Sequence, residues 1–236
     1  MDLPMFVKSA KPALLAAALC LTPVAAGVLP VTAVAQQTQR EVSADQAFPF
    51  LSKFLALPAS ERDEITIAYV LKIKGGTQGA SIVLKHNGQS QKLNIAGDGR
   101  ITPLPTLAQL RSGRIVLTGP EKGVAMRVRV FATETPAKTM SVAPLAKAVQ
   151  QADTAMRKVG GVLAMTQPKP DRLYFVGAGN ARVTLADGSQ KVLPKSPRDD
   201  AYPGGTPYLA PAELPGAVSI TFDAVPSRIG IDDRVK

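Results

Sequence analysis

A two-residue alternation of large apolar side chains runs from Ile65 to Ile73 and constrains the fold more than any other feature of the chain. Successive side chains of a strand point to opposite faces, so this period places one face of a strand on a core. The pair Asn87-Gly88 separates two further strand-like runs, residues 81–86 and 89–95. Such a pair tolerates the positive φ angles of a tight hairpin turn. The pattern therefore predicts antiparallel β-structure.

A second hairpin is predicted around residues 119–123, between the strand-like runs 114–118 and 124–131. In the later run, apolar side chains alternate with Arg127 and Arg129, so the two arginines share one face. Two amphipathic helices are also predicted. One lies within residues 44–57, where Pro49 makes the start uncertain, and the other follows Ser141 and ends at Gly160.

The two halves of the chain resemble each other. Residues 80–84 and the turn at Asn87-Gly88 are echoed by residues 181–185 and Asp187-Gly188, and residues 127–130 are echoed by 228–231. Hairpins share a common pattern of alternation and turn residues, which is the alternative explanation. We expect an α+β, mainly β fold of two tandem, related antiparallel units of sandwich-like form, each preceded by one amphipathic helix. The predicted units are residues 36–136 and 137–236, and their packing into one body or two is left open.

Residues 1–35 have the order of a cleavable export signal. Lys8 and Lys11 precede an apolar run at 13–21, helix-breaking residues follow, and Ala33-Val34-Ala35 forms a small-residue cleavage site. An uncleaved membrane anchor is the alternative, but the uninterrupted apolar run is shorter than a membrane span needs. The sequence predicts a periplasmic or secreted protein of Gram-negative type, with no membrane span after cleavage.

The chain lacks the residues that several kinds of catalytic and metal-binding site require. The single cysteine, Cys20, lies in the predicted leader, and the single histidine is His86, so we expect neither a transition-metal site nor another cofactor. The neighbouring carboxylates Asp199-Asp200 and Asp232-Asp233 would point to opposite faces of a strand, which does not suit paired acid–base work. The segment 177–180 lacks the third glycine of a dinucleotide loop. The sequence leaves open whether the protein is an enzyme, and the lack of an assembled catalytic or metal-binding set argues against it.

A formal net charge of +10 favours anionic partners. After export these would be an anionic envelope polymer, such as lipopolysaccharide phosphates or acidic polysaccharide, or another envelope protein, and not nucleic acid. Solubility alone is the other explanation for the charge. A long loop at 194–211, rich in Pro, Gly and charge, is either functional or disordered. The weak candidates for binding are cations on strands and tyrosines of this loop, namely Lys72, Lys74, Arg127, Arg129, Tyr202 and Tyr208.

The sequence thus favours a non-enzymatic binding or envelope-assembly protein of the periplasm. One alternative is a periplasmic hydrolase with its site under the 194–211 loop and His86 or carboxylates as acid–base groups. Another is a structural partner of a second envelope protein, which would add a strand at an exposed sheet edge.

Overall fold

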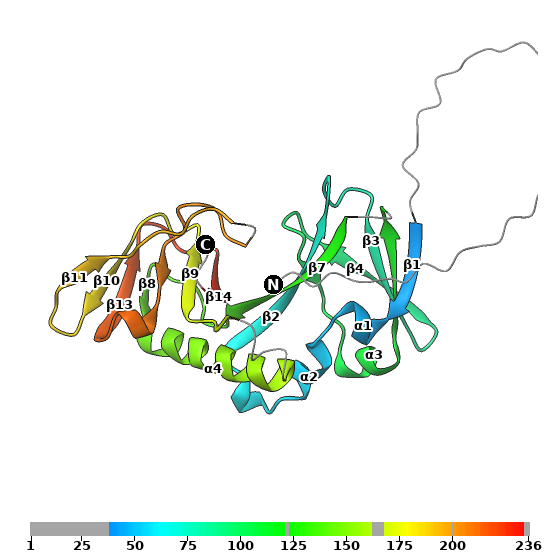
Figure 1. Cartoon of the computed structure of the whole chain (residues 1–236), viewed down its shortest axis with the longest axis horizontal. Coiled ribbons are helices and arrows are strands. Elements are labelled where there is room, and N and C mark those ends of the chain that lie inside the picture. Colours follow the sequence, from blue (N-terminus) through cyan, green and yellow to red (C-terminus); the bar gives the residue numbers. More distant parts are fainter. Residues whose placement is uncertain (1–37, 121–122, 162–167, 200, 234–236) are drawn as a thin grey trace, which may run out of the picture.

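The computed structural model describes residues 38–120, 123–161, 168–199 and 201–233 (Figure 1). The predicted leader, residues 1–35, lies outside this part of the chain. Among the described residues every strand pairing is antiparallel and the strands form three sheets, so the predicted α+β, mainly β class is confirmed. None of the described helices is both long and apolar enough to cross a membrane.

The first sheet belongs to the first half of the chain. Its strand order is β1 (Thr38–Ser43), β6 (Arg114–Gly119), β3 (Ser81–His86), β4 (Gln89–Ile95) and β5 (Ile101–Thr102). The hairpin predicted at Asn87-Gly88 joins β3 to β4, and both turn residues have positive φ angles, 49° and 74°. The asparagine and glycine provide this geometry with little strain.

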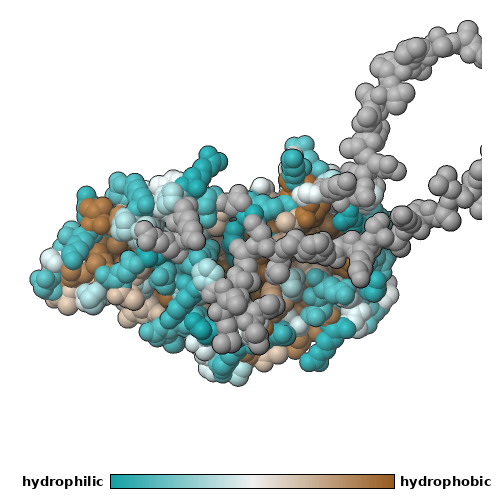
Figure 2. All heavy atoms as spheres, in the orientation of Figure 1, coloured by the Kyte–Doolittle hydropathy of each residue, from teal (hydrophilic) through white to brown (hydrophobic). Residues whose placement is uncertain are grey.

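The second sheet belongs to the second half. Its strand order is β11 (Gln190–Val192), β10 (Ala181–Leu185), β13 (Ala217–Phe222) and β8 (Thr139–Ser141). Figure 2 shows apolar residues at the surface of this end of the molecule. Val192 of β11 and Val218 of β13 are exposed, with 68% and 51% of their surface accessible.

The central sheet contains strands from both halves. Its order is β12 (Tyr208–Leu209), β9 (Arg172–Val176), β14 (Arg228–Asp232), β7 (Val124–Ala132) and β2 (Ile65–Ile73). The halves meet where β14 pairs with β7, through Gly230 opposite Phe131 and Ile231 opposite Val130. In contrast, β2 and β7 pair along their whole length, as expected for two long alternating strands.

In the described part of the chain, four α-helices cover these sheets, together with the short 3₁₀ turns 59–61 and 211–213. They are α1 (Ala44–Ala47), α2 (Leu51–Ala56), α3 (Leu107–Ser112) and α4 (Val142–Gly160). The single helix predicted within 44–57 is broken in two. Pro49 lacks an N–H donor and disfavours helical geometry at Phe48, and Phe50 adopts a φ of 73°.

Helix α4 has the predicted bounds. It begins after Ser141 and ends before Gly161, whose φ is 55°. Its apolar stripe packs on the central and second sheets, where Leu145 and Ala152 are fully buried. Figure 1 shows α4 running along one side of both halves. Gln151 ties it to the first half, because its side-chain oxygen accepts from the Glu64 backbone N–H at 2.8 Å.

The two faces of the central sheet differ in chemistry. One face carries the apolar positions of β2 and β7 and packs against α2 and α4. On the opposite face lie the polar positions, including Lys72, Arg127, Arg129 and Arg228. This second face, which no α-helix covers in the described structure, positions the candidate site.

Candidate functional site

The strand register brings cations from distant parts of the sequence onto one face. Directly opposed residues of antiparallel strands have their side chains on the same face. Arg127 is opposite Val70 and Arg129 is opposite Ala68, so both arginines share a face with Lys72. Because Gly230 is opposite Phe131, alternation along β14 places Arg228 on this face too.

A cleft of about 760 Å³ lies over this face, and we call it the basic cleft. Its floor is the central sheet. One wall is the β4–β5 turn, with Asp98 and Arg100, and the other is formed by loop residues 198–199 and 201–204. The two walls therefore come from different halves of the chain.

Positive charge predominates in the described lining. Five cations face two carboxylates, Asp98 and Asp199. The cations are Lys72, Arg100, Arg129, Arg198 and Arg228. Asp98 is shared between Arg100 Nε at 2.8 Å and an Arg228 terminal nitrogen at 3.0 Å. Among the described residues, no ion pair joins Lys72, Arg129 or Arg198 to a carboxylate.

The 194–211 loop has a defined conformation where it is described. Ser196 N–H donates to Thr206 O, Gly205 N–H donates to Ser196 O, and Tyr208 N–H donates to Pro194 O at 3.0 Å. At the tip, Asp199 Oδ1 accepts from the backbone N–H of Ala201 and Tyr202 at 2.7 and 2.6 Å. An aspartate that caps its own turn in this way is typical of tight loops.

Tyr202 fastens the loop to the sheet. Its ring stacks on that of Tyr174, with centroids 4.2 Å apart and planes within 14°, and only 3% of its surface is accessible. The Tyr174 hydroxyl donates to Asp233 O at 2.7 Å. Tyr202 thus lines the cleft as a buried anchor and offers no open stacking platform to a ligand.

Asp232 lies beneath this anchor. Burial raises its pKa to about 6, and the positive charge of Arg129 opposes that rise. Asp232 Oδ1 accepts from the Asp233 backbone N–H, and Oδ2 is 3.5 Å from the Tyr202 hydroxyl. A carboxylate with such a perturbed pKa is a common feature of functional sites, although structural networks also produce it.

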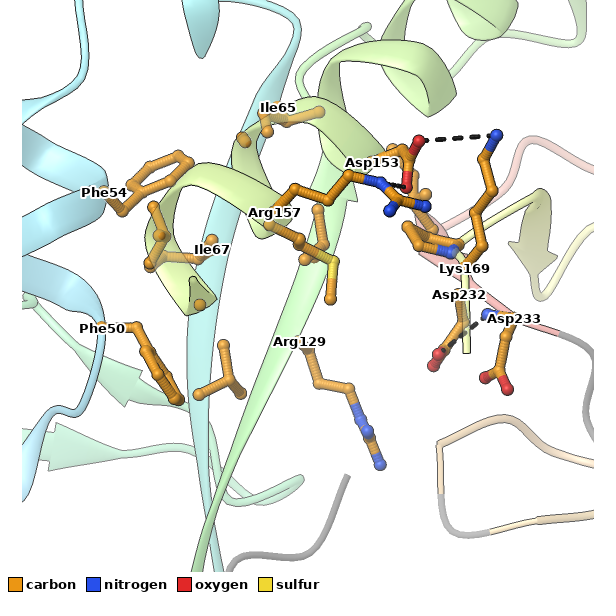
Figure 3. Close-up of a pocket in the computed structure, with 18 of the residues that line it drawn as sticks. Phe50, Phe54, Ile65, Ile67, Arg129, Asp153, Arg157, Lys169, Asp232 and Asp233 are labelled. Carbon is orange, nitrogen blue, oxygen red and sulfur yellow. Dashed lines mark hydrogen bonds and ion pairs between the residues drawn. The ribbon is translucent and has the colours of Figure 1, made fainter. Parts of the chain in front are cut away.

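An apolar cavity of about 140 Å³ lies on the other face of the same sheet, between α2, α4, β2 and β7 (Figure 3). Its apolar lining includes Phe50, Phe54, Ile65, Ile67, Met126, Val128 and Met156. At its rim Asp153 pairs with Arg157 at 2.9 Å and with Lys169 at 3.4 Å. Arg129 lines both this cavity and the basic cleft.

The structure separates the six candidates from the sequence into two groups. Lys72, Arg129 and Tyr202 line the basic cleft. Lys74, Arg127 and Tyr208 do not appear in its described lining. Lys74 lies just beyond β2, and Tyr208 on β12 receives the Arg172 guanidinium 5.1 Å from its ring centroid.

Sequence reasoning missed Asp98, Arg100, Arg198 and Arg228 as lining residues. The last of these carried a signal, because residues 228–231 echo the strand with Arg127 and Arg129. His86 ends β3 opposite Gln89 and lines neither cavity. Asp200, part of a carboxylate pair considered above, lies outside the described residues.

The described residues hold no cluster of His, Cys, Asp and Glu side chains that could bind a metal ion. What they hold is a concave surface with a positive field and guanidinium donors. Such groups bind phosphate and carboxylate oxygens well, because the planar fork of arginine donates two parallel hydrogen bonds. No protein-family model, curated protein or solved structure matches this chain, so the geometry of the cleft is the basis for any functional conclusion.

Proposed function

We propose that this protein is an exported, non-enzymatic binding protein of the periplasm that captures an anionic ligand in the basic cleft. The observation that carries the proposal is the excess of cations in the described lining, five against two carboxylates. A positive cleft with partly apolar walls focuses its field and concentrates anions. A phosphate-bearing envelope polymer fits this chemistry.

The backbone segments that carry the cations are ordered before any ligand arrives. Lys72 and Arg129 project from paired strands of one sheet, and Arg228 is held by Asp98. Arg198 belongs to the loop segment that Tyr202 anchors. A preorganised backbone reduces the conformational entropy lost on binding, which favours affinity.

We also infer that the two halves are related units. In the first sheet β6 lies between β1 and β3, and β4 lies beside β3. In the second sheet β13 lies between β8 and β10, and β11 lies beside β10. The antiparallel strand pairs β2–β7 and β9–β14 also correspond to each other, and the basic cleft lies where the two pairs meet. The 194–211 loop exists in only one unit, which supports a specialised role for it.

The proposal is tested by calorimetric titration of the exported protein with pyrophosphate at about 50 mM salt. We expect Arg129→Gln and Arg198→Gln each to weaken binding about tenfold, because each removes a charge-assisted contact. The matched control is Arg111→Gln, the same loss of charge at an exposed position of α3. Absence of binding, or equal weakening by all three substitutions, would show that the cleft is not an anion site.

The hydrolase is a second candidate, and the raised pKa of Asp232 is the observation that favours it. It requires turnover of an envelope substrate that is abolished by Asp232→Asn. If Asp232→Asn leaves any measured turnover unchanged, the hydrolase proposal is wrong.

A further inference from the structure

We infer that the ligand of the basic cleft is an amphipathic anion, a single-chain alkyl phosphate or its close chemical relative, whose chain enters the apolar cavity behind β7. This inference rests on the proposed function, since it names the ligand class of the same cleft. It is carried by the two cavities, their shared residue and the fork between β7 and β14.

The apolar cavity has the size of a small hydrocarbon group. Its volume is about 140 Å³, and its apolar walls come from α2, α4, β2 and β7. A cavity of roughly 150 Å³ with Leu, Ile and Phe walls stays dry and accepts benzene. The cavity therefore suits a chain segment of about six carbons.

β14 ends at Asp232, whereas β7 continues past this point on the side of Arg129, and we call this place the fork. In the described structure these strands pair only at residues 130–131 of β7 and 230–231 of β14. Arg129 and Asp232 belong by alternation to the face of the cleft, yet both line the cavity. The cavity thus borders the fork, and it shares Arg129 with the basic cleft. In Figure 3 the Arg129 side chain extends away from α4, toward the side where Asp232 and Asp233 also lie.

The charges around the cavity orient such a ligand. Asp153 is already paired with Arg157 and Lys169 at the rim. Asp232 and Asp233, at the end near the fork, disfavour an anionic group inside the cavity. The headgroup is therefore directed to the cations of the cleft, while the alkyl chain occupies the cavity.

A series of alkyl phosphates tests this inference, with ethyl, butyl, hexyl and octyl phosphate titrated into the exported protein below their aggregation concentrations. Each methylene that enters an apolar site contributes about a fourfold gain in affinity. We expect this gain up to about six carbons and a plateau beyond, where the cavity is full. A series in which all four ligands bind within twofold of one another would overturn the inference while leaving the anion site intact. If pyrophosphate binds but no member of the series does, the inference fails and the proposed function stands; if neither pyrophosphate nor any alkyl phosphate binds, both fail.

Two substitutions separate entry into the cavity from nonspecific apolar binding. Val128→Phe fills the cavity and should abolish the chain-length dependence while ethyl phosphate still binds. Val218→Phe, at an exposed valine of β13, is the matched control and should preserve the dependence. Met156→Ala enlarges the cavity and should move the plateau to longer chains, which provides a test if Val128→Phe fails to fold. An unchanged chain-length dependence in Val128→Phe, or an unchanged plateau in Met156→Ala, would show that the chain binds elsewhere.

Discussion

The ring of Tyr202 occupies the space where a side chain at Gly230 would begin. A Cβ at position 230 would lie 2.6 Å from Cε1 of Tyr202 and nearer still to its hydroxyl. The bare backbone of β14 at this point lets the tyrosine lie against the sheet and stack on Tyr174. The glycine therefore determines how closely the 194–211 loop approaches the central sheet.

Gly230→Ala should displace Tyr202 and lower the free energy of unfolding by about 1–3 kcal/mol, the usual cost of overpacking a closely packed contact. Urea denaturation measures this change. In a Tyr202→Ala background the same substitution should cost much less, because the clashing ring is gone. Equal costs in the two backgrounds would show that the alanine side chain at position 230 clashes with a residue other than Tyr202.

The raised pKa of Asp232 makes stability depend on pH. Its value of about 6 in the folded protein lies above the ordinary value of 3.8, so the folded state binds the proton more tightly. The contribution of Asp232 to the free energy of unfolding is therefore fully present below about pH 4 and is lost as the pH rises through 6. Asp232→Asn should remove this loss and raise the free energy of unfolding at pH 8 by up to about 3 kcal/mol.

Asp223 provides the control of opposite sign. Hydrogen bonds from the Asn180 side chain and backbone lower its pKa, so its contribution is present above the unfolded pKa and is lost as the pH falls. Asp223→Asn should therefore reduce the stability lost in acid, whereas Asp232→Asn should act between pH 4 and 6. If Asp232→Asn leaves the pH profile between 4 and 6 unchanged, Asp232 does not hold a raised pKa.

Asp98 limits the positive charge of the basic cleft. Its carboxylate pairs with Arg100 and Arg228, so Asp98→Asn leaves both guanidinium groups available to a ligand. Pyrophosphate should then bind roughly two- to fivefold more tightly, because partly exposed pairs of this kind are worth at most about 1 kcal/mol. Calorimetric titration checks this change, and weaker binding would mean that Asp98 positions the arginines more than it competes with the ligand.

Gln151 links α4 to the first half of the chain. Its side-chain oxygen accepts from Glu64 N–H, and its nitrogen donates to Asp63 Oδ1 at 2.6 Å and to Ser60 O at 3.1 Å. Gln151→Ala should lower the free energy of unfolding by about 1–3 kcal/mol, since the Glu64 N–H loses its partner. Gln150→Ala, at the exposed neighbouring position, should have little effect in the same denaturation experiment.

Local structure was predictable where one pattern dominates. The bounds of β2 and of the β3–β4 hairpin follow from alternation and from Asn87-Gly88. The stripe and end signals of α4 predict that helix, and Pro49 explains why the first predicted helix is divided. The short helix α3 was missed, although Thr106 and Gln109 form a capping box that indicates its start.

The basic cleft was predictable only in part, because its residues come from strands and loops that are distant along the chain. Lys72 and Arg129 belong to regular strands, so the two-residue alternation alone predicts the face of the strand on which each side chain lies. Arg100 and Arg198 lie in irregular segments, where no periodicity reveals direction. Their convergence depends on the pairing of β14 with β7, and a single sequence carries no direct record of which distant strands pair.

That pairing also has a mechanical consequence. Two residue pairs form the ladder between β7 and β14, while the walls of the cleft belong to opposite sides of that ladder. A rotation about so short an axis would change the width of the cleft without disrupting the sheet of either half. Helix α4 contacts both halves, and its hydrogen bond from Glu64 N–H to Gln151 would oppose this rotation. The width of the cleft therefore depends on the angle between the halves, which two residue pairs and the contacts of α4 hold.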